Sequence, residues 1–420
     1  MRLLRLLLPA LLGLLPACGS GNIGDLFSIF PREAFTPPGG TGGGGGGQPF
    51  VPAEVASLGG ADGLTGEVKN IVIATVDVRT YAFLAAGASG VHVVDVTEPD
   101  LLNRGDYITT VRDAVLTPPA SLAGGRCDAL AVVDGSFLVC LAVGSGAANA
   151  VTVFSIPDLI AGATNPTADL SSAFLPPAAG SAIPAPGDAD AKGGGVSGAG
   201  AIFFVAGGGP TLGRGTIDPV LMEWTADVPI PVPTTPTVDR VLDVLTNQTT
   251  AIYLSVQAGT QYGIVSMGHP SLPLPVTPSF TSIDGDFAAL ASQFISGPGN
   301  FPLDLALDTL SLFVSGDDEV HAFNITNPVA PARLDPIQNT GVDTIAVAAA
   351  GGQVAVGAGD FLRVYASLGG QTRLLAQVSF PGTFTVRGVA FRSSDAGSFV
   401  LCCAGTNGGL RVVQLTRSQQ

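Results

Sequence analysis

Charged residues are scarce in this chain of 420 residues: Asp, Glu, Lys and Arg make up 12% of it, about half the usual share. Only 18 of them are basic against 33 acidic, which gives a formal net charge of −15, and no Lys/Arg cluster stands out. Such a surface repels phosphate backbones, so we expect no nucleic-acid partner. It also excludes charge-driven binding to anionic lipid, so attachment to a membrane requires a covalent anchor.

Motifs for catalysis or cofactor binding are equally scarce. The chain has no HExxH metal motif, and its Gly-rich runs lack the Lys-Ser/Thr of a phosphate-binding loop. The nearest approach to a GxSxG nucleophile elbow is the segment GVSGA at 195–199, which fails at its last position. We interpret this segment as a loop, and we predict no catalytic residue and no cofactor.

Glycine, proline and apolar residues are abundant instead. There are 57 Gly and 32 Pro, and apolar residues make up 46% of the chain. Disordered chains are rich in charge and poor in apolar residues, and long helices tolerate few Gly or Pro. The composition therefore favours many short strands joined by turns.

The first 18 residues have the features of an export signal. Arg2 and Arg5 form a basic start, and the apolar run from Leu6 to Leu15 is too short to span a bilayer, which takes about 20 residues. The segment ends Leu15-Pro16-Ala17-Cys18 and resembles a lipobox, the site at which bacterial lipoproteins are cleaved and lipidated. Proline two residues before the cysteine departs from that pattern, where a small residue is usual.

The resemblance implies that Cys18 carries the lipid and that residues 1–18 are its signal peptide. Several acyl chains anchor a protein stably without a transmembrane helix. Gly19, which is not Asp, implies sorting to the outer membrane, on its periplasmic or its cell-surface face. Two alternatives stay open, namely an ordinary cleaved signal with Cys18 incidental, and an uncleaved membrane anchor.

A Gly/Pro-rich segment separates this signal from the rest. Residues 19–49 contain the run PPGGTGGGGGGQ at 37–48, and Gly-rich chains behave as flexible coils. We predict a tether over 19–49 that carries a folded domain over 50–420. The alternative is a low-complexity insertion without a role.

The domain contains an internal repeat, in which an apolar strand, a Gly-containing turn and an alternating strand follow one another. The residues that open the alternating strand are spaced 42 to 69 positions apart, at Val91, Val151, Val220, Tyr262, Val320, Leu362 and Leu410. A four-stranded propeller blade needs about 40–50 residues plus loops. Seven copies therefore predict an all-β, seven-bladed β-propeller of four-stranded antiparallel blades. Residues 50–59 are strand-like and are expected to join the last blade and close the ring.

Two copies are especially regular, GVHVVDVTEP at 90–99 and VHAFNITNP at 320–328. They resemble the LVIVD family of β-propeller repeats, which occurs in exported bacterial proteins, and the resemblance extends over about residues 68–416. It implies the fold and says little about function, because propellers carry many unrelated activities.

Polar residues of the repeats have structural interpretations. His92 and His321 share one strand position, so we interpret both as structural and not as metal ligands. Asp95 and Asn324 share another position, just before a turn, where a short polar side chain can accept from backbone N–H groups. Both are interpreted as turn-formers.

Cys127 and Cys140 flank a hairpin whose turn we place at Asp134-Gly135. With that register the two cysteines are diagonal neighbours on one face of the sheet, so they are candidates for a disulfide in an oxidising compartment, or for two reduced thiols.

Four carboxylates stand near the starts of the strands that precede the repeat units: Asp128, Asp243, Asp304 and Asp343. If these strands line the central channel, the carboxylates are weak candidates for a metal site, with Ca²⁺ as the ion to test. The competing interpretation is that they accept hydrogen bonds from backbone N–H groups between blades.

Together these features predict an exported, lipid-anchored, monomeric propeller that acts as a non-enzymatic binding or scaffolding module at the bacterial cell envelope. Its expected partners are envelope proteins, contacted through the long insertions 159–198 and 226–238. The alternatives are a cation-assisted, hydrolase-like enzyme with its site at the central channel, and a glycan- or ligand-binding propeller.

Overall fold

Side chains alternate between two faces along a strand, and in this chain both faces are apolar. In β11 (Ile202–Ala206), Phe203 and Val205 enter one core cluster, whereas Phe204 and Ala206 enter another. A sheet with two apolar faces must be covered on both sides. A ring of sheets meets this demand, because each sheet covers its two neighbours.

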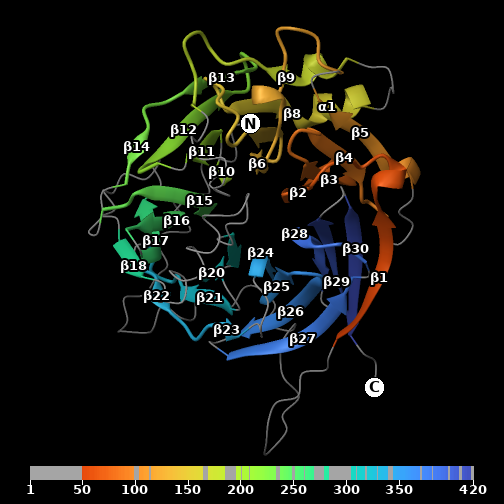
Figure 1. The fold of residues 1–420 in the computed structure, drawn as a ribbon, viewed down its shortest axis with the longest axis vertical. Coiled ribbons are helices and arrows are strands. Elements are labelled where there is room, and N and C mark those ends of the chain that lie inside the picture. The colour runs from red at the N-terminus through yellow and green to blue at the C-terminus, as the bar shows by residue number, and fades with distance from the viewer. Residues whose placement is uncertain are drawn as a thin grey trace, which may run out of the picture. The chain divides into compact units, whose positions relative to one another are not determined.

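The computed structural model shows this ring of seven sheets (Figure 1). It describes residues 50–98, 104–112, 115–163, 169–184, 195–199, 201–207, 209–232, 237–247, 251–259, 261–268, 279–282, 304–308, 310–316, 319–328, 330–338, 344–368, 371–380, 382–395, 398–405 and 409–417. The signal and tether predicted for 1–49 lie outside these residues. Residues 48–420 cluster as one unit.

The first four blades are antiparallel meanders that follow one another along the chain. Blade 1 is β2 (Asn70–Val76), β3 (Arg79–Ala85), β4 (Val91–Asp95) and β5 (Tyr107–Val111). Blade 2 is β6 (Ala129–Val133), β7 (Phe137–Leu141), β8 (Val151–Ser155) and β9 (Phe174–Leu175), and helix α1 (Ile156–Ala163) follows β8. Blade 3 is β10 (Val196–Ala199), β11, β12 (Thr211–Asp218) and β13 (Glu223–Ala226), with β14 (Ile230–Pro231) also on β12. Blade 4 is β15 (Arg240–Asn247), β16 (Ala251–Ala258), β17 (Gln261–Gly268) and β18 (Ser279–Ser282).

The last three blades continue the ring. Blade 5 is β19 (Leu305–Asp308), β20 (Ser311–Ser315), β21 (Glu319–Asn324) and β22 (Ala332–Arg333), with β23 (Ile337–Gln338) also on β21. Blade 6 is β24 (Thr344–Ala350), β25 (Gln353–Ala358), β26 (Phe361–Leu368) and β27 (Gln371–Ser379). Blade 7 is β28 (Val386–Asp395), β29 (Ser398–Gly405), β30 (Leu410–Arg417) and β1 (Phe50–Leu58). The predicted seven-bladed propeller of four-stranded antiparallel blades is confirmed.

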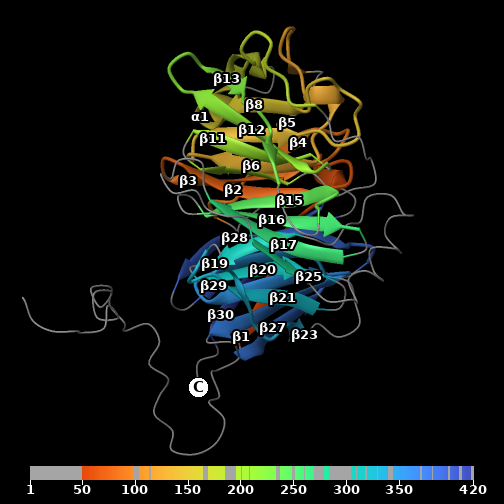
Figure 2. The same cartoon turned by 90° about the vertical axis from the view of Figure 1, so that its left-hand side faces the viewer.

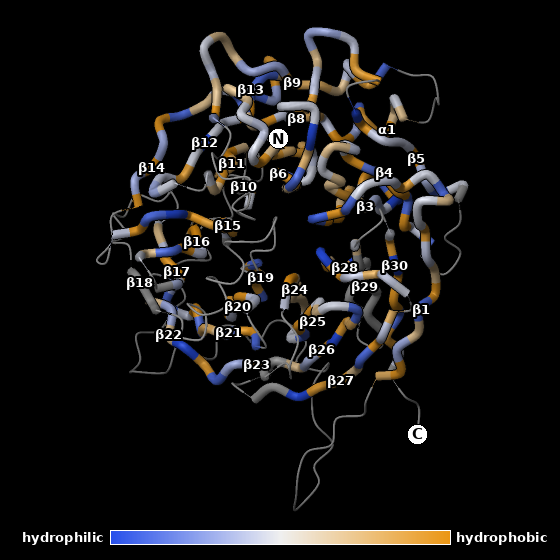
Figure 3. Tube along the Cα trace, in the orientation of Figure 1, coloured by the Kyte–Doolittle hydropathy of each residue, from blue (hydrophilic) through white to orange (hydrophobic). Residues whose placement is uncertain are grey.

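The core is divided into layers between the blades. Among the described residues, seven apolar clusters occur, and each joins two neighbouring blades. Figure 3 shows apolar segments, in orange, along the strands around the ring, and Figure 2 gives the view turned by 90°. Because every layer needs two blades, no blade can bury its apolar surface alone.

The first strand closes the ring. β1 pairs antiparallel with β30, from Phe50 opposite Arg417 to Leu58 opposite Leu410, so the start and the end of the domain share blade 7. Leu58 is 3% exposed and packs in the layer between blades 7 and 1. The expected closure by residues 50–59 is confirmed.

Blade 3 differs from its sequence-based interpretation. Val220, expected to open an alternating strand, lies in the turn between β12 and β13, and the strand in question is Thr211–Asp218. The segment 195–199, interpreted as a loop, supplies the inner strand β10. Gly198 is required there, because a Cβ would overlap the side chain of Val133 in the neighbouring blade.

Both insertions expected to contact partners are partly built into the core. Within 159–198, helix α1 buries Leu159, Ile160 and Ala163 in the layer between blades 1 and 2. Within 226–238, β14 pairs with β12, and Val232 and Val238 are buried. These described parts stabilise the fold and are not free contact loops.

We predict that ring closure depends on the buried end of β1. Leu58→Ala should lower the free energy of unfolding by about 2–4 kcal/mol, because it opens a cavity between blades 7 and 1. Val51→Ala, on the same strand but 56% exposed, is the control and should change it by less than about 0.5 kcal/mol. Urea unfolding measures both, and equal midpoints for the two variants would contradict the role of β1.

Candidate functional site

The centre of the ring encloses a cavity of about 310 Å³. All seven inner strands line it, namely β2, β6, β10, β15, β19, β24 and β28. Consecutive inner strands contact one another all the way round. Asp243 and Asp304 are the acidic residues among the described lining, which is otherwise mostly apolar and small residues.

These polar residues connect one blade to the next. Asp243 Oδ2 accepts a hydrogen bond from Leu305 N over 3.1 Å, and Asp304 Oδ2 accepts from Val347 N over 3.0 Å. Asn70 Oδ1 accepts from Leu130 N over 3.3 Å. In each case a side chain at the start of one inner strand binds a backbone N–H of the following inner strand.

Blades without an acceptor at this position have a small residue. Gly195 precedes β10, and a Cβ there would overlap Asp243 Oδ1 and stand 2.6 Å from Val244 N. Asp243 Oδ1 itself accepts from Val244 N over 2.8 Å, so it satisfies the N–H that Gly195 cannot reach. One carboxylate thus serves two consecutive inner strands, β15 and β19.

The interpretation of these carboxylates as acceptors between blades is therefore confirmed for Asp243 and Asp304. Within the described parts of the chain, no three His, Cys, Asp or Glu side chains come together in a way that could hold a metal ion. Asp343 lies outside the described residues. Asn70 was missed in the sequence, although it opens an inner strand as the aspartates do.

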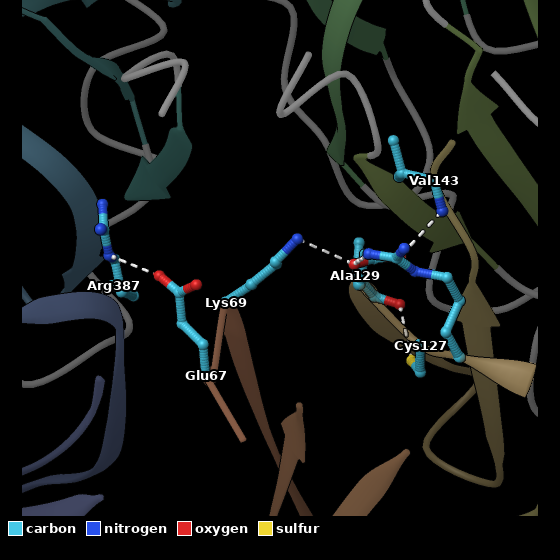
Figure 4. Close-up of polar contacts among 8 residues, drawn as sticks. Glu67, Lys69, Cys127, Ala129, Val143 and Arg387 are labelled. Carbon is cyan, nitrogen blue, oxygen red and sulfur yellow. Dashed lines mark hydrogen bonds and ion pairs between the residues drawn. The ribbon is translucent and has the colours of Figure 1, made fainter. Parts of the chain in front are cut away.

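Asp128 makes a different contact, with Lys69 of blade 1 and with Arg126. Figure 4 shows Lys69 of this group and the neighbouring pair of Glu67 and Arg387. Lys69 Nζ lies 3.0 Å from Asp128 Oδ1, Arg126 donates to both carboxylate oxygens, and Val143 N donates to Oδ2 over 2.9 Å. Beside it, Arg387 of blade 7 pairs with Glu67 over 3.2 Å.

The side chain of Asp128 is 4% exposed. Burial raises the pKa of its carboxyl, but the hydrogen bond from Arg126 and the charge of Lys69 outweigh burial and lower the pKa below the usual value. Asp128 is therefore a charged structural residue. It does not line the central cavity.

The cysteines of the predicted pair are both buried in the layer between blades 1 and 2. The hairpin turns at Asp134-Gly135, as expected, but strand pairing resumes one residue later, with Val133 opposite Phe137. Cys127 Sγ donates to the carbonyl oxygen of Ala129 over 3.4 Å, and burial raises the pKa of Cys127 well above its usual value. Both cysteines are free thiols in this structure, and a bridge between them stays a prediction.

The histidines are part of the strand framework. His92 is fully buried, with Nδ1 2.8 Å from Thr110 Oγ1 and Nε2 2.7 Å from the carbonyl of Thr65. Burial lowers the pKa of His92 and keeps it neutral. His321 is equally buried, 3.6 Å from Glu319 Oε1.

The turn-forming residues behave as expected. Asp95 Oδ1 accepts from Thr97 N over 2.9 Å, and Asn324 Oδ1 accepts from Thr326 N over 2.8 Å. Each side chain caps the turn that follows its strand, so their interpretation as turn-formers is confirmed.

Comparison with known proteins supports the fold alone. No protein-family model matches the chain, and no curated protein matches it. The solved structures that are similar to it include the WD40 repeats of RRP9 and the protein U3-55K, each with a TM-score of 0.56 and 13% identity. The matches cover 88% and 87% of this chain and the whole of both others. The resemblance to LVIVD repeats stays a prediction.

Among the described residues, no helix is long and apolar enough to cross a bilayer.

We predict that Asp304 acts through its hydrogen bond to the next blade. Asp304→Ala should lower the free energy of unfolding by about 1–3 kcal/mol, because it leaves Val347 N without this acceptor. Asp304→Asn keeps a carbonyl oxygen as acceptor and should lower the free energy of unfolding by less than half as much. Chemical unfolding with and without Ca²⁺ measures this, and a Ca²⁺-dependent gain in the wild type that Asp304→Ala abolishes would contradict it.

We predict a pH-dependent contribution from Asp128. Its pKa is lower in the folded than in the unfolded state, so its stabilisation is complete above about pH 4 and is lost as pH falls through the folded pKa. Asp128→Asn should destabilise the protein by about 3 kcal/mol at pH 7, and the difference from wild type should narrow below about pH 4. Unfolding curves from pH 8 to 3 test this. A difference that is constant over the range would show that charge is not what Asp128 contributes.

Proposed function

We propose that this chain is an exported, lipid-anchored β-propeller that acts as a non-enzymatic binding or scaffolding module at the bacterial cell envelope. The observation that carries the proposal is the use of Asp243 and Asp304. Their carboxylates accept from backbone N–H groups of the following blades, so the groups best placed for chemistry in the cavity support the ring.

The other candidate groups also have structural partners. Asp128 is held by Lys69 and Arg126, and His92 is bonded at both ring nitrogens. A catalytic site needs a nucleophile, acid or base within reach of a bound substrate. Among the described candidates, none both lines the cavity and is without a structural hydrogen bond or ion pair.

A rigid ring with broad faces suits protein recognition. One of the similar solved structures consists of WD40 repeats, and this likeness of fold supports a role in binding. The envelope location rests on the lipobox-like LPAC at 15–18 and the basic, apolar segment before it. Envelope proteins are therefore the proposed partners, and Cys18 is the proposed lipid attachment site.

We predict that Cys18 alone determines membrane attachment. The wild-type chain, expressed with its own leader, should lose residues 1–17, gain the mass of its acyl chains and sediment with membranes. Cys18→Ala should stay unacylated and leave the membrane fraction, whereas the neighbouring control Ser20→Ala should behave as wild type. Intact mass and fractionation decide between these outcomes, and an unacylated wild type would refute the anchor.

Capture of partners from detergent-solubilised envelope tests the binding function separately. Wild type should bring down a reproducible envelope protein, and Asp304→Asn should still do so, because the cavity is not the binding site in this proposal. Capture that fails in Asp304→Asn, while its fold and stability are retained, would move the function to the central cavity.

A further inference from the structure

Two faces of the ring can be distinguished by chain connectivity. Each blade is an antiparallel meander, so the turns between its first and second strands, and between its third and fourth, lie at one end. We name this end the hairpin face. It includes 77–78 in blade 1, 219–222 in blade 3 and Leu310 in blade 5.

These three turns present large apolar side chains to solvent. Val78 is 87% exposed, Val220 86%, Leu221 66% and Leu310 54%. The turns belong to blades 1, 3 and 5, which are spread around the ring (Figure 1). Apolar tips on alternate blades do not form one compact patch, and they fit contact with an extended flat surface better than with a pocket-sized ligand.

The turn in blade 3 is built to hold its tip outward. Asp218 Oδ1 accepts from Val220 N over 2.8 Å and from Leu221 N over 2.9 Å. Met222 adopts a φ of 53°, in the left-handed region that residues other than glycine rarely adopt. The chain thus keeps a strained, capped turn whose two outermost side chains are apolar.

The described part of the chain begins on the same face. β30 is the third strand of blade 7 and runs toward the hairpin face, and Phe50 pairs with Arg417 at its end. Thirty-one residues, 19–49, separate Phe50 from Cys18. A flexible chain of that length reaches about 30 Å, so an anchor at Cys18 leaves Phe50, on the hairpin face, within reach of the membrane.

We propose that the hairpin face rests on the lipid bilayer, with Val78, Val220, Leu221 and Leu310 inserted at its surface. This inference rests on the proposed lipid anchor. Contact through apolar tips also suits a chain of net charge −15, which gains nothing from anionic lipid. The opposite face then points away from the membrane and is open to partners.

Fluorescence quenching by lipid tests this orientation. The acylated full chain is reconstituted in vesicles of phosphatidylethanolamine and phosphatidylcholine brominated on its acyl chains. Wild type gives the background fluorescence of Trp224, the one tryptophan of the chain. Val220→Trp places a reporter on the hairpin face. Val228→Trp is the matched control, because Val228 is 85% exposed in the same blade, beyond the opposite end of β13.

Surface-bound apolar groups enter the headgroup–acyl boundary by about 5–10 Å, so Val220→Trp should be quenched at least about twofold more than Val228→Trp. Leu221→Trp should repeat the result of Val220→Trp. Equal quenching at 220 and 228, or stronger quenching at 228, would overturn the orientation.

The two proposals fail in distinguishable ways. An acylated protein that floats with vesicles but leaves Val220→Trp unquenched retains its anchor and loses the membrane-facing surface. If the same substitution abolishes capture of an envelope protein, the hairpin face belongs to a protein partner and the proposal is wrong. A chain that is not acylated overturns both proposals.

Discussion

The structure depends on one constraint: each blade is apolar on both faces and needs a neighbour on each side. Phe203 and Phe204, adjacent in β11, enter different interblade layers, and the same alternation recurs around the ring. Seven layers between seven blades satisfy the constraint only if the ring closes. Closure is provided by β1, which comes from the start of the domain and pairs with β30 at its end.

The same constraint explains why the central carboxylates are not free for chemistry. Inner strands lie side by side without pairing in one sheet, so backbone N–H groups along the channel need side-chain acceptors. Asn70, Asp243 and Asp304 provide them, each toward the following blade. The cavity therefore has polar residues that hold neighbouring blades in register.

Much of this fold could be predicted from the repeat, because alternation and turn residues are local signals. Blade 3 was misplaced because the apolar run Val220-Leu221-Met222 imitates a strand, whereas the capping carboxylate of Asp218 makes it a turn. The aspartates of the inner strands were recognised, but which N–H each one binds depends on the offset between blades. That offset is set by packing, so neither the pairing of Asp243 with Leu305 nor the role of Asn70 could be derived.

Hydrogen exchange at the inner strands tests this account most directly. The backbone amides of Leu130, Leu305 and Val347 donate hydrogen bonds to side chains of the preceding blade, and these bonds should protect them from exchange. If those bonds hold the ring, the three amides should exchange only through global unfolding, as slowly as the core of β11, and Ca²⁺ should not alter them. Exchange much faster than that of β11, slowed by added Ca²⁺, would mean that the carboxylates form an ion site and not the joints between blades.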